Sequence, residues 1–514
     1  MLNLQSVRRK PGQQTAQVVT IPAPIGGWNA RDAISAMEPT DAITLDNFFP
    51  DSGGVRLRMG YTEHVSALGA VIESLMTWSG PAANPVLLAA RPTSIVDVTA
   101  AGSGVSSQTG LTNGRWQHVM FATTGGNFLV ICNGADSVLN FNGTSWSTPS
   151  ISGVSSTSLV NVTSHVNRLW FVQDNTLDAW YLPVASISGT AVKLPLGPFC
   201  KKGGKLLAIA SWTRDGGAGM DDNAVFITNK GEAVIYAGSD PSSAATWAKV
   251  GTFDIPEPVG HRCVVKIGAD VGIITSQGVL PLSAILPLSS SGVAKVAATD
   301  KISGAAREAY EGSATAFGWQ LIEYPKEQML ILNVPIVESV TTHQYVMNTQ
   351  NGAWCRFTGM NAGCWALLGD VLYFGGHDGK IYKYGTGFAD AGEEINAVSI
   401  SAFTDLGSPS TKKFTQVRPM LYGPDGYSPL IALRTDYDLG EFDYSATTSI
   451  SLGSFWDEED WDDADWGLGI VPSSQWQSVL VKPGSRVSAV LSVAVTDEVR
   501  FNAYDLMFEV GGAL

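Results

Sequence analysis

Three segments of the sequence decide the fold: GWQLIEYPKEQMLILNVP (318–335), HQYVMNTQNGAWCRFTG (343–359) and CWALLGDVLYFGGHDGKIYKYG (364–385). Each segment alternates short apolar runs with turn-forming residues. Asn351-Gly352 is a strong hairpin signal, and His377-Asp378-Gly379 forms a second turn between two short strands. The segments therefore predict two consecutive antiparallel sheets about 40 residues apart, which is the spacing of blades in a β-propeller.

The same pattern recurs along the preceding part of the chain. Seven apolar runs are centred at Leu87, Phe128, Leu169, Val225, Val271, Met329 and Val371. The intervals between centres run from 41 to 58 residues, and a four-stranded blade needs about 40 to 50. Because the runs are continuous, the strands should be buried on both faces. We expect an all-β fold, a propeller of about six to seven blades, with insertions at residues 183–224 and 281–318.

Two short helices are expected beside the strands. Residues 303–310 begin with a serine suited to an N-cap position and end close to a glycine. Residues 39–48 could form a second helix, because Pro39 fits the first helical turn.

Three arginines lie near the first strands. Val55–Met59 alternates apolar residues with Arg56 and Arg58, which predicts a strand with one basic face. Together with Arg31, these arginines could bind phosphate or the acidic surface of a partner. Pairing with nearby carboxylates is the alternative that we favour.

The pattern changes after Gly385. Residues 396–446 and 470–514 contain longer strands that alternate apolar and polar side chains, which favours a small antiparallel β-sandwich-like module. We therefore divide the chain into a flexible N-terminal arm (1–20), a segment leading into the propeller (21–80), the propeller with its insertions (81–390) and a C-terminal β-rich module (391–514).

The composition limits the classes of function. The chain has 514 residues, of which 45% are apolar and 15% charged, unlike a disordered protein. Its net charge of −15 argues against a protein that clamps phosphates or reads a nucleic-acid sequence, because such proteins need a basic face. The five cysteines lack CxxC spacing and are expected to be buried free thiols. We expect neither a signal peptide nor a membrane-spanning helix, since no sufficiently long apolar run occurs.

Much of the negative charge lies in one segment. Between Thr435 and Val481 the sequence has eleven acidic residues and no lysine or arginine. The candidate acidic surface of a channel or interface consists of Asp457, Glu458, Glu459, Asp460, Asp462, Asp463 and Asp465. Candidate structural anchors within the same segment are Trp456, Trp461 and Trp466. Calcium binding is an alternative, but the segment lacks the glycine and the ligand order of an EF-hand loop.

Signatures of catalysis, cofactor binding and metal binding are weak. The sequence has no GxSxG, HExxH or Walker A motif, and its six histidines are widely separated. We therefore expect no enzymatic activity, no cofactor and no metal site. The alternative is a carbohydrate-binding or glycan-degrading propeller, and hydrolysis would need two carboxylates roughly 5–10 Å apart. Asp221 and Asp222 are the most suggestive adjacent acids, although they could simply begin a strand.

Five segments together resemble one family. They are LDNFFPDSGGVRLRMGY (45–61), GWQLIEYPKEQMLILNVP (318–335), NTQNGAWCRFTGMNAGCWA (348–366), WDEEDWDDADWG (456–467) and FEVGGAL (508–514). In these segments the chain resembles the tail tubular, or nozzle, proteins of short-tailed phages (podoviruses), which are virion structural proteins of the head-to-tail region. The motifs that carry the resemblance are structural.

The resemblance implies a role and a set of partners. A nozzle protein would form a homo-hexameric ring with a central channel, below the portal and its head-to-tail adaptor, and would contact tail fibre or spike proteins. Viral double-stranded DNA would pass through without sequence-specific binding. The protein would be located in the virion tail after assembly in the host cytoplasm. A passage for DNA should hold phosphate weakly, and an acidic protein is compatible with this requirement.

Overall fold

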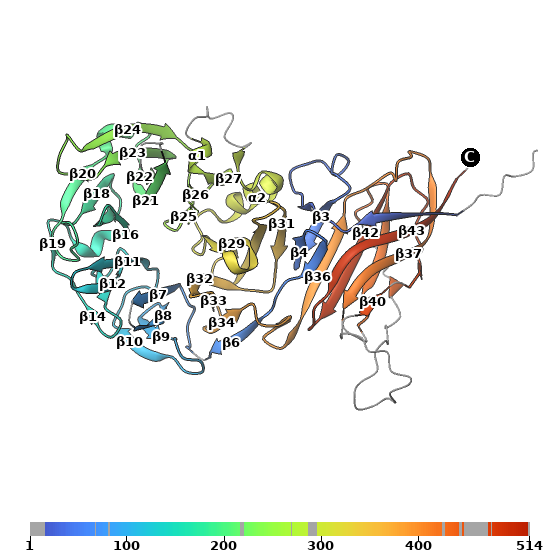
Figure 1. Cartoon of the computed structure of the whole chain (residues 1–514), viewed down its shortest axis with the longest axis horizontal. Coiled ribbons are helices and arrows are strands. Elements are labelled where there is room, and N and C mark those ends of the chain that lie inside the picture. Colours follow the sequence, from blue (N-terminus) through green and yellow to red (C-terminus); the bar gives the residue numbers. More distant parts are fainter. Residues whose placement is uncertain are drawn as a thin grey trace, which may run out of the picture. The chain divides into compact units, whose positions relative to one another are not determined.

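A computed structural model describes residues 16–66, 68–80, 83–215, 220–268, 270–285, 296–423, 427–440, 445–446, 471–473 and 475–511. The chain divides into two compact units (Figure 1). One comprises Trp28–Arg31 and Arg58–Ile395, and the other comprises Met1–Gly27, Asp32–Leu57 and Asn396–Leu514. Both are built mainly from antiparallel strands. Among the described residues, no helix is long and apolar enough to cross a membrane.

Small antiparallel sheets follow one another around a ring in the first unit, which we call the propeller (Figure 1). Blade one contains β7 (Ser74–Gly80), β8 (Ala83–Arg91), β9 (Ser94–Asp97) and β10 (Val105–Thr109). Blade two contains β11 (Gln117–Thr123), β12 (Gly126–Cys132), β13 (Leu139–Phe141) and β14 (Trp146–Ser147). Blade three contains β16 (Leu159–His165), β17 (Arg168–Gln173), β18 (Asp178–Tyr181) and β20 (Val192–Pro195).

Four further sheets complete the ring. Blade four contains β21 (Leu206–Asp215), β22 (Met220–Thr228), β23 (Glu232–Gly238) and β24 (Trp247–Asp254). Blade five contains β25 (Val264–Ile267), β26 (Asp270–Thr275) and β27 (Gly278–Pro281). Blade six contains β28 (Gln320–Tyr324), β29 (Met329–Val337), β30 (Thr341–Asn348) and β31 (Trp354–Phe357). Blade seven contains β32 (Ala362–Leu368), β33 (Val371–Gly376), β34 (Ile381–Tyr384) and β6 (Tyr61–Val65).

The predicted propeller fold is confirmed. Each of the seven predicted strand centres lies in the second strand of a blade, which is β8, β12, β17, β22, β26, β29 or β33. Aromatic side chains fill the space between blades. Between blades three and four, Trp170 stacks on Trp247 with their ring centroids 5.6 Å apart, and Phe226 meets Trp170 edge-on. Second strands are therefore buried on both faces, as the continuous apolar runs indicated.

Blade seven is closed by a strand from the start of the unit. The outer strand β6 pairs antiparallel with β34, so that Val65 lies opposite Ile381 and Tyr61 opposite Tyr384. Val65 is fully buried in an apolar cluster that also contains Leu87 of blade one. Hydrogen bonds between residues far apart in the sequence thus join the two ends of the ring. The outer edge of β34 is paired with β6 and is therefore not open.

Blade five has three strands, and the chain that follows covers its edge. The Ala298 N–H donates to the Val279 carbonyl (2.9 Å), and the Val279 N–H donates to Thr299 Oγ1 (3.0 Å). Helical elements flank this contact: α1 (Leu282–Ile285), η4 (Asp300–Ile302) and α2 (Ser303–Ser313). The predicted helix at 303–310 is therefore confirmed as part of α2.

The second unit, which we call the sandwich, combines strands from both ends of the chain. One sheet contains β4 (Phe48–Asp51), β5 (Gly54–Leu57), β43 (Arg500–Val510), β37 (Lys412–Gly423), β40 (Val471–Ser473), β1 (Gln17–Pro22) and β41 (Gln477–Ser478). The other contains β3 (Asp41–Asp46), β36 (Glu393–Ser401), β42 (Val487–Val495), β38 (Leu430–Thr435) and β39 (Ser445–Ala446). Tyr504 of β43 faces Ser399 and Ser401 of β36, so side chains of the two sheets share one core.

The remaining elements are short. Strands β15 (Ile151–Ser152) and β19 (Gly189–Thr190) form a parallel pair, and β35 (Ala389–Asp390) pairs with β6. The other short elements are strand β2 (Gly27–Trp28) and the 3₁₀ turns η1 (Ser156–Ser158), η2 (Gly197–Phe199) and η5 (Pro325–Glu327).

Two local predictions are wrong. Residues 39–48 contain β3 and the start of β4 rather than a helix, because Ala42, Leu45 and Asp46 pair with β36 and the β-branched Ile43 and Thr44 favour a strand. Residues 183–224 are not an insertion, since they contain β20, η2, β21 and the start of β22. The wide interval before Val225 comes from the long strands of blade four. In the predicted arm, residues 17–20 belong to β1, and residues 1–15 lie outside the described part.

Candidate functional site

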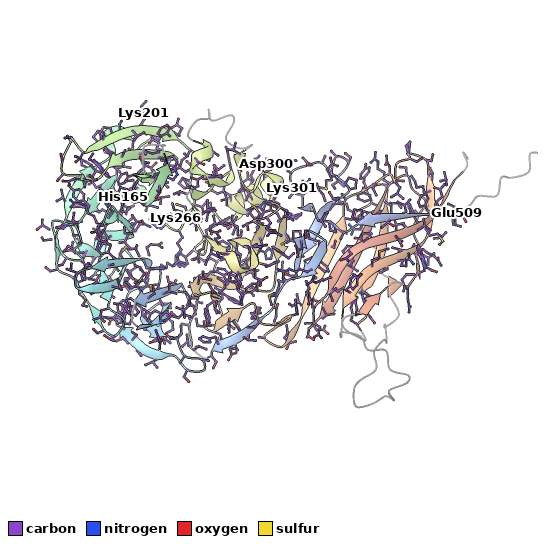
Figure 2. The ribbon with its side chains drawn as sticks, in the orientation of Figure 1. His165, Lys201, Lys266, Asp300, Lys301 and Glu509 are labelled. Atoms are coloured by element: carbon purple, nitrogen blue, oxygen red, sulfur yellow. The ribbon has the colours of Figure 1, made fainter. Side chains whose placement is uncertain are left out.

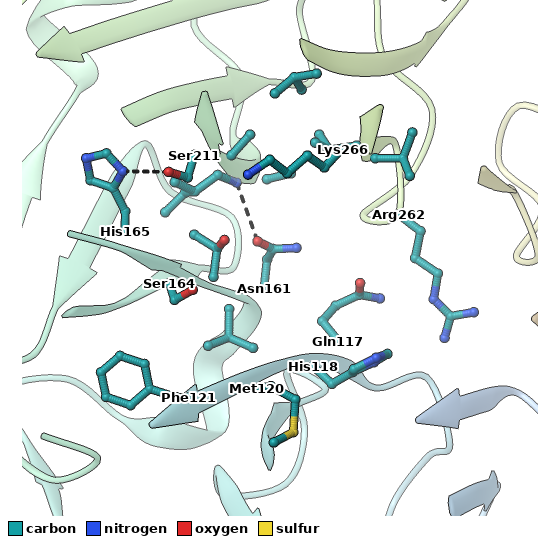
Figure 3. A pocket seen from close by; sticks show the side chains of 18 of the residues that line it. Gln117, His118, Met120, Phe121, Asn161, Ser164, His165, Ser211, Arg262 and Lys266 are labelled. Carbon is teal, nitrogen blue, oxygen red and sulfur yellow. Dashed lines mark hydrogen bonds between the residues drawn. The ribbon is translucent and has the colours of Figure 1, made fainter. Parts of the chain in front are cut away.

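A cavity of about 750 Å³ lies on the axis of the propeller (Figure 3). The innermost strand of every blade contributes to its wall. The contributing strands and examples of their residues are β7 (Leu75), β11 (Gln117), β16 (Ser164), β21 (Ser211), β25 (Lys266), β28 (Leu321) and β32 (Cys364). A volume in this range is typical of a small-molecule site, at about 300–1,000 Å³.

Arg262 is held in a fixed position in the cavity wall. Its Nη2 donates to Ser74 Oγ (2.6 Å) and to the carbonyls of Glu73 (3.1 Å) and Trp116 (3.3 Å). The guanidinium also lies over the Phe317 ring, 4.7 Å from its centroid. Burial lowers the pKa of Arg262 below its ordinary value, but a guanidinium stays charged in proteins.

The carboxylate nearest to Arg262 is engaged elsewhere. Glu73 accepts a hydrogen bond from Arg115 Nε (3.0 Å) and another from the Gly114 N–H (2.8 Å). Arg262 itself donates to uncharged acceptors, so its charge has no direct carboxylate partner among the described residues.

Lys266 is the second cation of the cavity. Its side chain is exposed and extends into the centre of the ring (Figures 2 and 3). Among the described residues, Lys266 forms no hydrogen bond and no ion pair. Lys266 lies on the inner strand β25, and Arg262 lies in the turn just before that strand. Both cations line the cavity (Figure 3).

His118 lines the cavity from β11, and Figure 3 shows its ring on the same side as Arg262. The side chain is exposed to the cavity but surrounded by the propeller. Desolvation by this enclosure, and secondly the charge of Arg262, lower the pKa of His118 to about 4. The imidazole is therefore neutral at pH 7.

A serine and a histidine meet on the opposite side of the cavity. His165 Nδ1 lies 2.9 Å from Ser211 Oγ (Figure 3), a distance suited to a nucleophile and its base. Burial lowers the pKa of His165 to about 4, however, and its Nε2 has no hydrogen-bond partner among the described residues. Asp222 instead accepts from Thr213 Oγ1 (2.7 Å). The pair therefore lacks the carboxylate that orients the histidine of a catalytic triad.

The predicted site residues are only partly brought to this cavity. Asp222 is the one carboxylate among its described lining residues, and Asp221 precedes it in β22, so the two acids lie within a strand. The acidic candidates Asp457, Glu458, Glu459, Asp460, Asp462, Asp463 and Asp465 lie outside the described residues. The same holds for the candidate anchors Trp456, Trp461 and Trp466.

Two of the three arginines near the first strands pair with carboxylates, as we favoured. Arg58 forms a buried ion pair with Asp390, and Arg31 pairs with Asp300. Arg56 lies over the Phe49 ring, 4.9 Å from its centroid. The described part of the chain contains no group of three or more histidine, cysteine, aspartate or glutamate side chains that could hold a metal ion.

Sequence reasoning missed Arg262 and Lys266. The segment HRCVVKIG (261–268) precedes the predicted strand at Val271 and has two basic residues on one face of an otherwise apolar run. In a propeller, the strand before a second strand is the innermost strand of its blade. Counting one strand back from the centre at Val271 would therefore have placed Lys266 on the innermost strand and Arg262 just before it.

Comparisons with known proteins add only the general fold. The chain matches no protein-family model and no curated protein sequence. It is similar to BBS1N solved in complex with ARL6DN (10% identity, 64% of this chain and 98% of that chain, TM-score 0.39). It is also similar to virginiamycin B lyase from Staphylococcus aureus (12%, 64% and 98%, TM-score 0.35) and to the WD40 β-propeller domain of Doa1 (8%, 64% and 97%, TM-score 0.36). At these TM-scores, the similarities carry no argument about function.

Proposed function

We propose that this chain is a structural component of a short phage tail, in which six copies form a ring around a passage for double-stranded DNA. The resemblance of residues 45–61, 318–335 and 348–366 to nozzle proteins motivates the proposal. The observation that carries it is the way both units are closed by strands from distant parts of the chain.

Such closure suits a protein with a mechanical role. In the propeller, β6 completes blade seven through its pairing with β34. In the sandwich, β1 and β5 from the beginning of the chain both pair with β43 at its end. Separating either pair requires breaking several backbone hydrogen bonds together, so each unit resists opening at its ends. A protein that remains in place while DNA passes benefits from this resistance.

The passage for DNA would have to form between copies of the chain. The axial cavity, at about 750 Å³, has the size of a small-molecule site. It is too small for a DNA duplex, whose major groove alone is about 12 Å wide. Its wall also contains Arg262 and Lys266, which would hold phosphate rather than release it. The net charge of −15 favours an assembly whose common lumen is acidic.

The proposed partners are the head-to-tail adaptor, tail fibre or spike proteins, and other copies of this chain in the virion tail. The outer loops of the blades are suited to such contacts, because loops can vary without disturbing the sheets. Glycan hydrolysis receives no comparable support, since Asp222 is the single carboxylate among the described residues of the axial wall.

Electron microscopy of the purified chain, alone and mixed with an adaptor ring, tests the proposal. We expect six-fold rings with an axial hole that stack on the adaptor. A chain that stays monomeric under both conditions would contradict it. Cleavage of a host polysaccharide by that monomer would instead support the hydrolytic alternative.

A further inference from the structure

We propose that the axial cavity of the propeller binds a small organic oxyanion, such as a phosphate ester or a carboxylate, through Lys266 and Arg262. The inference concerns one copy of the chain and does not depend on the proposed ring. It is motivated by positive charge without a matching carboxylate inside a cavity of about 750 Å³.

The charges of the cavity wall do not compensate one another. Lys266 has no partner among the described residues, and Arg262 donates only to Ser74 and to two backbone carbonyls. Asp222 is the single described acid of the wall and already accepts from Thr213. A partly buried charge such as that of Arg262 gains from a partner of opposite sign, and the exposed ammonium of Lys266 adds a second positive charge to the same cavity. An oxyanion from solution would supply the missing partner.

The site is already organised for an anion. Three hydrogen bonds and the Phe317 ring fix the guanidinium of Arg262, so little side-chain freedom is lost when a ligand binds. Lys266 is the adaptable member, because its long side chain extends freely into the cavity (Figure 3). A fixed arginine and a movable lysine can contact oxyanions of different size.

The rest of the wall indicates a ligand larger than inorganic phosphate. Gln117 and Ser164 offer neutral hydrogen-bonding groups, whereas Met120 and Phe121 offer apolar contact. Pockets that combine a charged group with a few polar groups and apolar walls hold organic molecules. A compact organic acid or a sugar phosphate has this combination of features.

His118 provides an internal reporter. Its ring lies on the side of Arg262, whose positive charge disfavours the imidazolium. An anion bound beside Arg262 would offset this repulsion and accept a hydrogen bond from the protonated ring. The pKa of His118 should therefore rise when the cavity is occupied.

Calorimetric titration of the full-length protein at pH 7 and constant ionic strength tests the proposal. The probes are inorganic phosphate, glucose 6-phosphate and citrate, with glucose as the neutral probe. The variant is Lys266→Met, and the matched control is Lys326→Met, whose exposed lysine lies on η5 outside the cavity. Both variants remove one positive charge and keep the apolar stem.

We expect saturable binding of at least one oxyanion at one site per chain. The affinity should fall about tenfold or more in Lys266→Met and change by less than about twofold in Lys326→Met. Tighter binding of citrate than of the phosphates would assign the site to carboxylates, and the reverse to phosphates. Equal binding of glucose and glucose 6-phosphate, unchanged affinity in Lys266→Met or no saturable binding would each overturn the proposal.

Nuclear magnetic resonance of the His118 ring gives a second readout. At an oxyanion concentration that just saturates the wild type, the pKa of His118 should rise in the wild type and rise less in Lys266→Met, where the site is only partly occupied. An oxyanion that binds without moving the pKa of His118 occupies another place, and this result would also overturn the assignment.

Discussion

Arg58 carries its charge inside the propeller, where its guanidinium pairs with Asp390 and donates to the carbonyls of Met59 and Thr358. Removing one partner of a buried ion pair leaves the other charge uncompensated, which costs about 3–5 kcal/mol. We predict that Arg58→Met lowers the free energy of unfolding by about this amount. Urea denaturation followed by tryptophan fluorescence measures the loss.

Arg307→Met is the matched control for this substitution. Arg307 pairs with Glu311 on the surface of α2, and the two side chains are 75% and 61% exposed. An exposed pair of this kind contributes about 0.5 kcal/mol or less. Similar losses in the two variants would show that the ion pair of Arg58 is not buried as described.

His165 makes the stability of the propeller depend on pH. Burial lowers its pKa from 6.5 to about 4, so the unfolded chain binds a proton more readily than the folded chain between these values. Stability must therefore fall as the pH decreases through this range. For His165 alone, the full loss is on the order of 3 kcal/mol.

The variant His165→Asn tests this assignment, because asparagine cannot titrate and can still hydrogen-bond to Ser211. We predict that the free energy of unfolding of the variant decreases less than that of the wild type between pH 6.5 and pH 4. Denaturation curves at intermediate pH values provide the comparison. Parallel pH profiles of the two proteins would exclude His165 as the titrating group.

The outer strand β6 holds the ring of blades closed, and Val65 anchors it in the core between blades one and seven. Val65→Ala removes two methyl groups from a fully buried position and should cost about 2–3 kcal/mol of unfolding free energy. Val105→Ala is the control, since Val105 is 68% exposed on the outer strand β10 of blade one. Its effect should be within about 0.5 kcal/mol, and an equal effect at the two positions would argue against closure by β6.

Local patterns predicted the second strands of the blades well. These strands are buried on both faces, so their continuous apolar runs distinguish them from the surrounding sequence. The hairpin turn at Asn351-Gly352 was equally clear, and it lies between β30 and β31. Both features depend only on residues that are close together in the sequence.

Pairing between distant segments could not be predicted in the same way. Strand β6 has the sequence YTEHV, which is mostly polar, and its place is set by β34 more than 300 residues later. Strand β3 was predicted as a helix because its partner β36 could not be recognised. The axial cations were missed for a related reason. The wall of the cavity combines residues from every blade, and these residues are far apart in the sequence.

All five cysteines lie in the propeller, so their reactivity tests whether the propeller unfolds as one body. All are free and buried, which confirms the prediction from their spacing. Burial also raises the pKa of Cys263 and Cys364 to about 12 and that of Cys200 to about 11, so little reactive thiolate exists near neutral pH. We predict that a thiol reagent at pH 8 labels no cysteine in the native protein and all of them in urea. Rapid labelling of one cysteine before unfolding would identify a blade that opens alone.

Assembly is the property on which the proposed function depends. The axial cavity of one chain has the size of a small-ligand site, so a passage for duplex DNA requires several copies. The two proposals can therefore fail separately. Loss of oxyanion binding in Lys266→Met concerns the cavity of one propeller, whereas failure to form rings concerns the surfaces between copies.

Native mass spectrometry of the purified chain, alone and with an adaptor ring, tests the assembly most directly. We predict a particle of six times the 54.4 kDa of one chain, in the free protein or on the adaptor. A single species of 54.4 kDa under both conditions would contradict it.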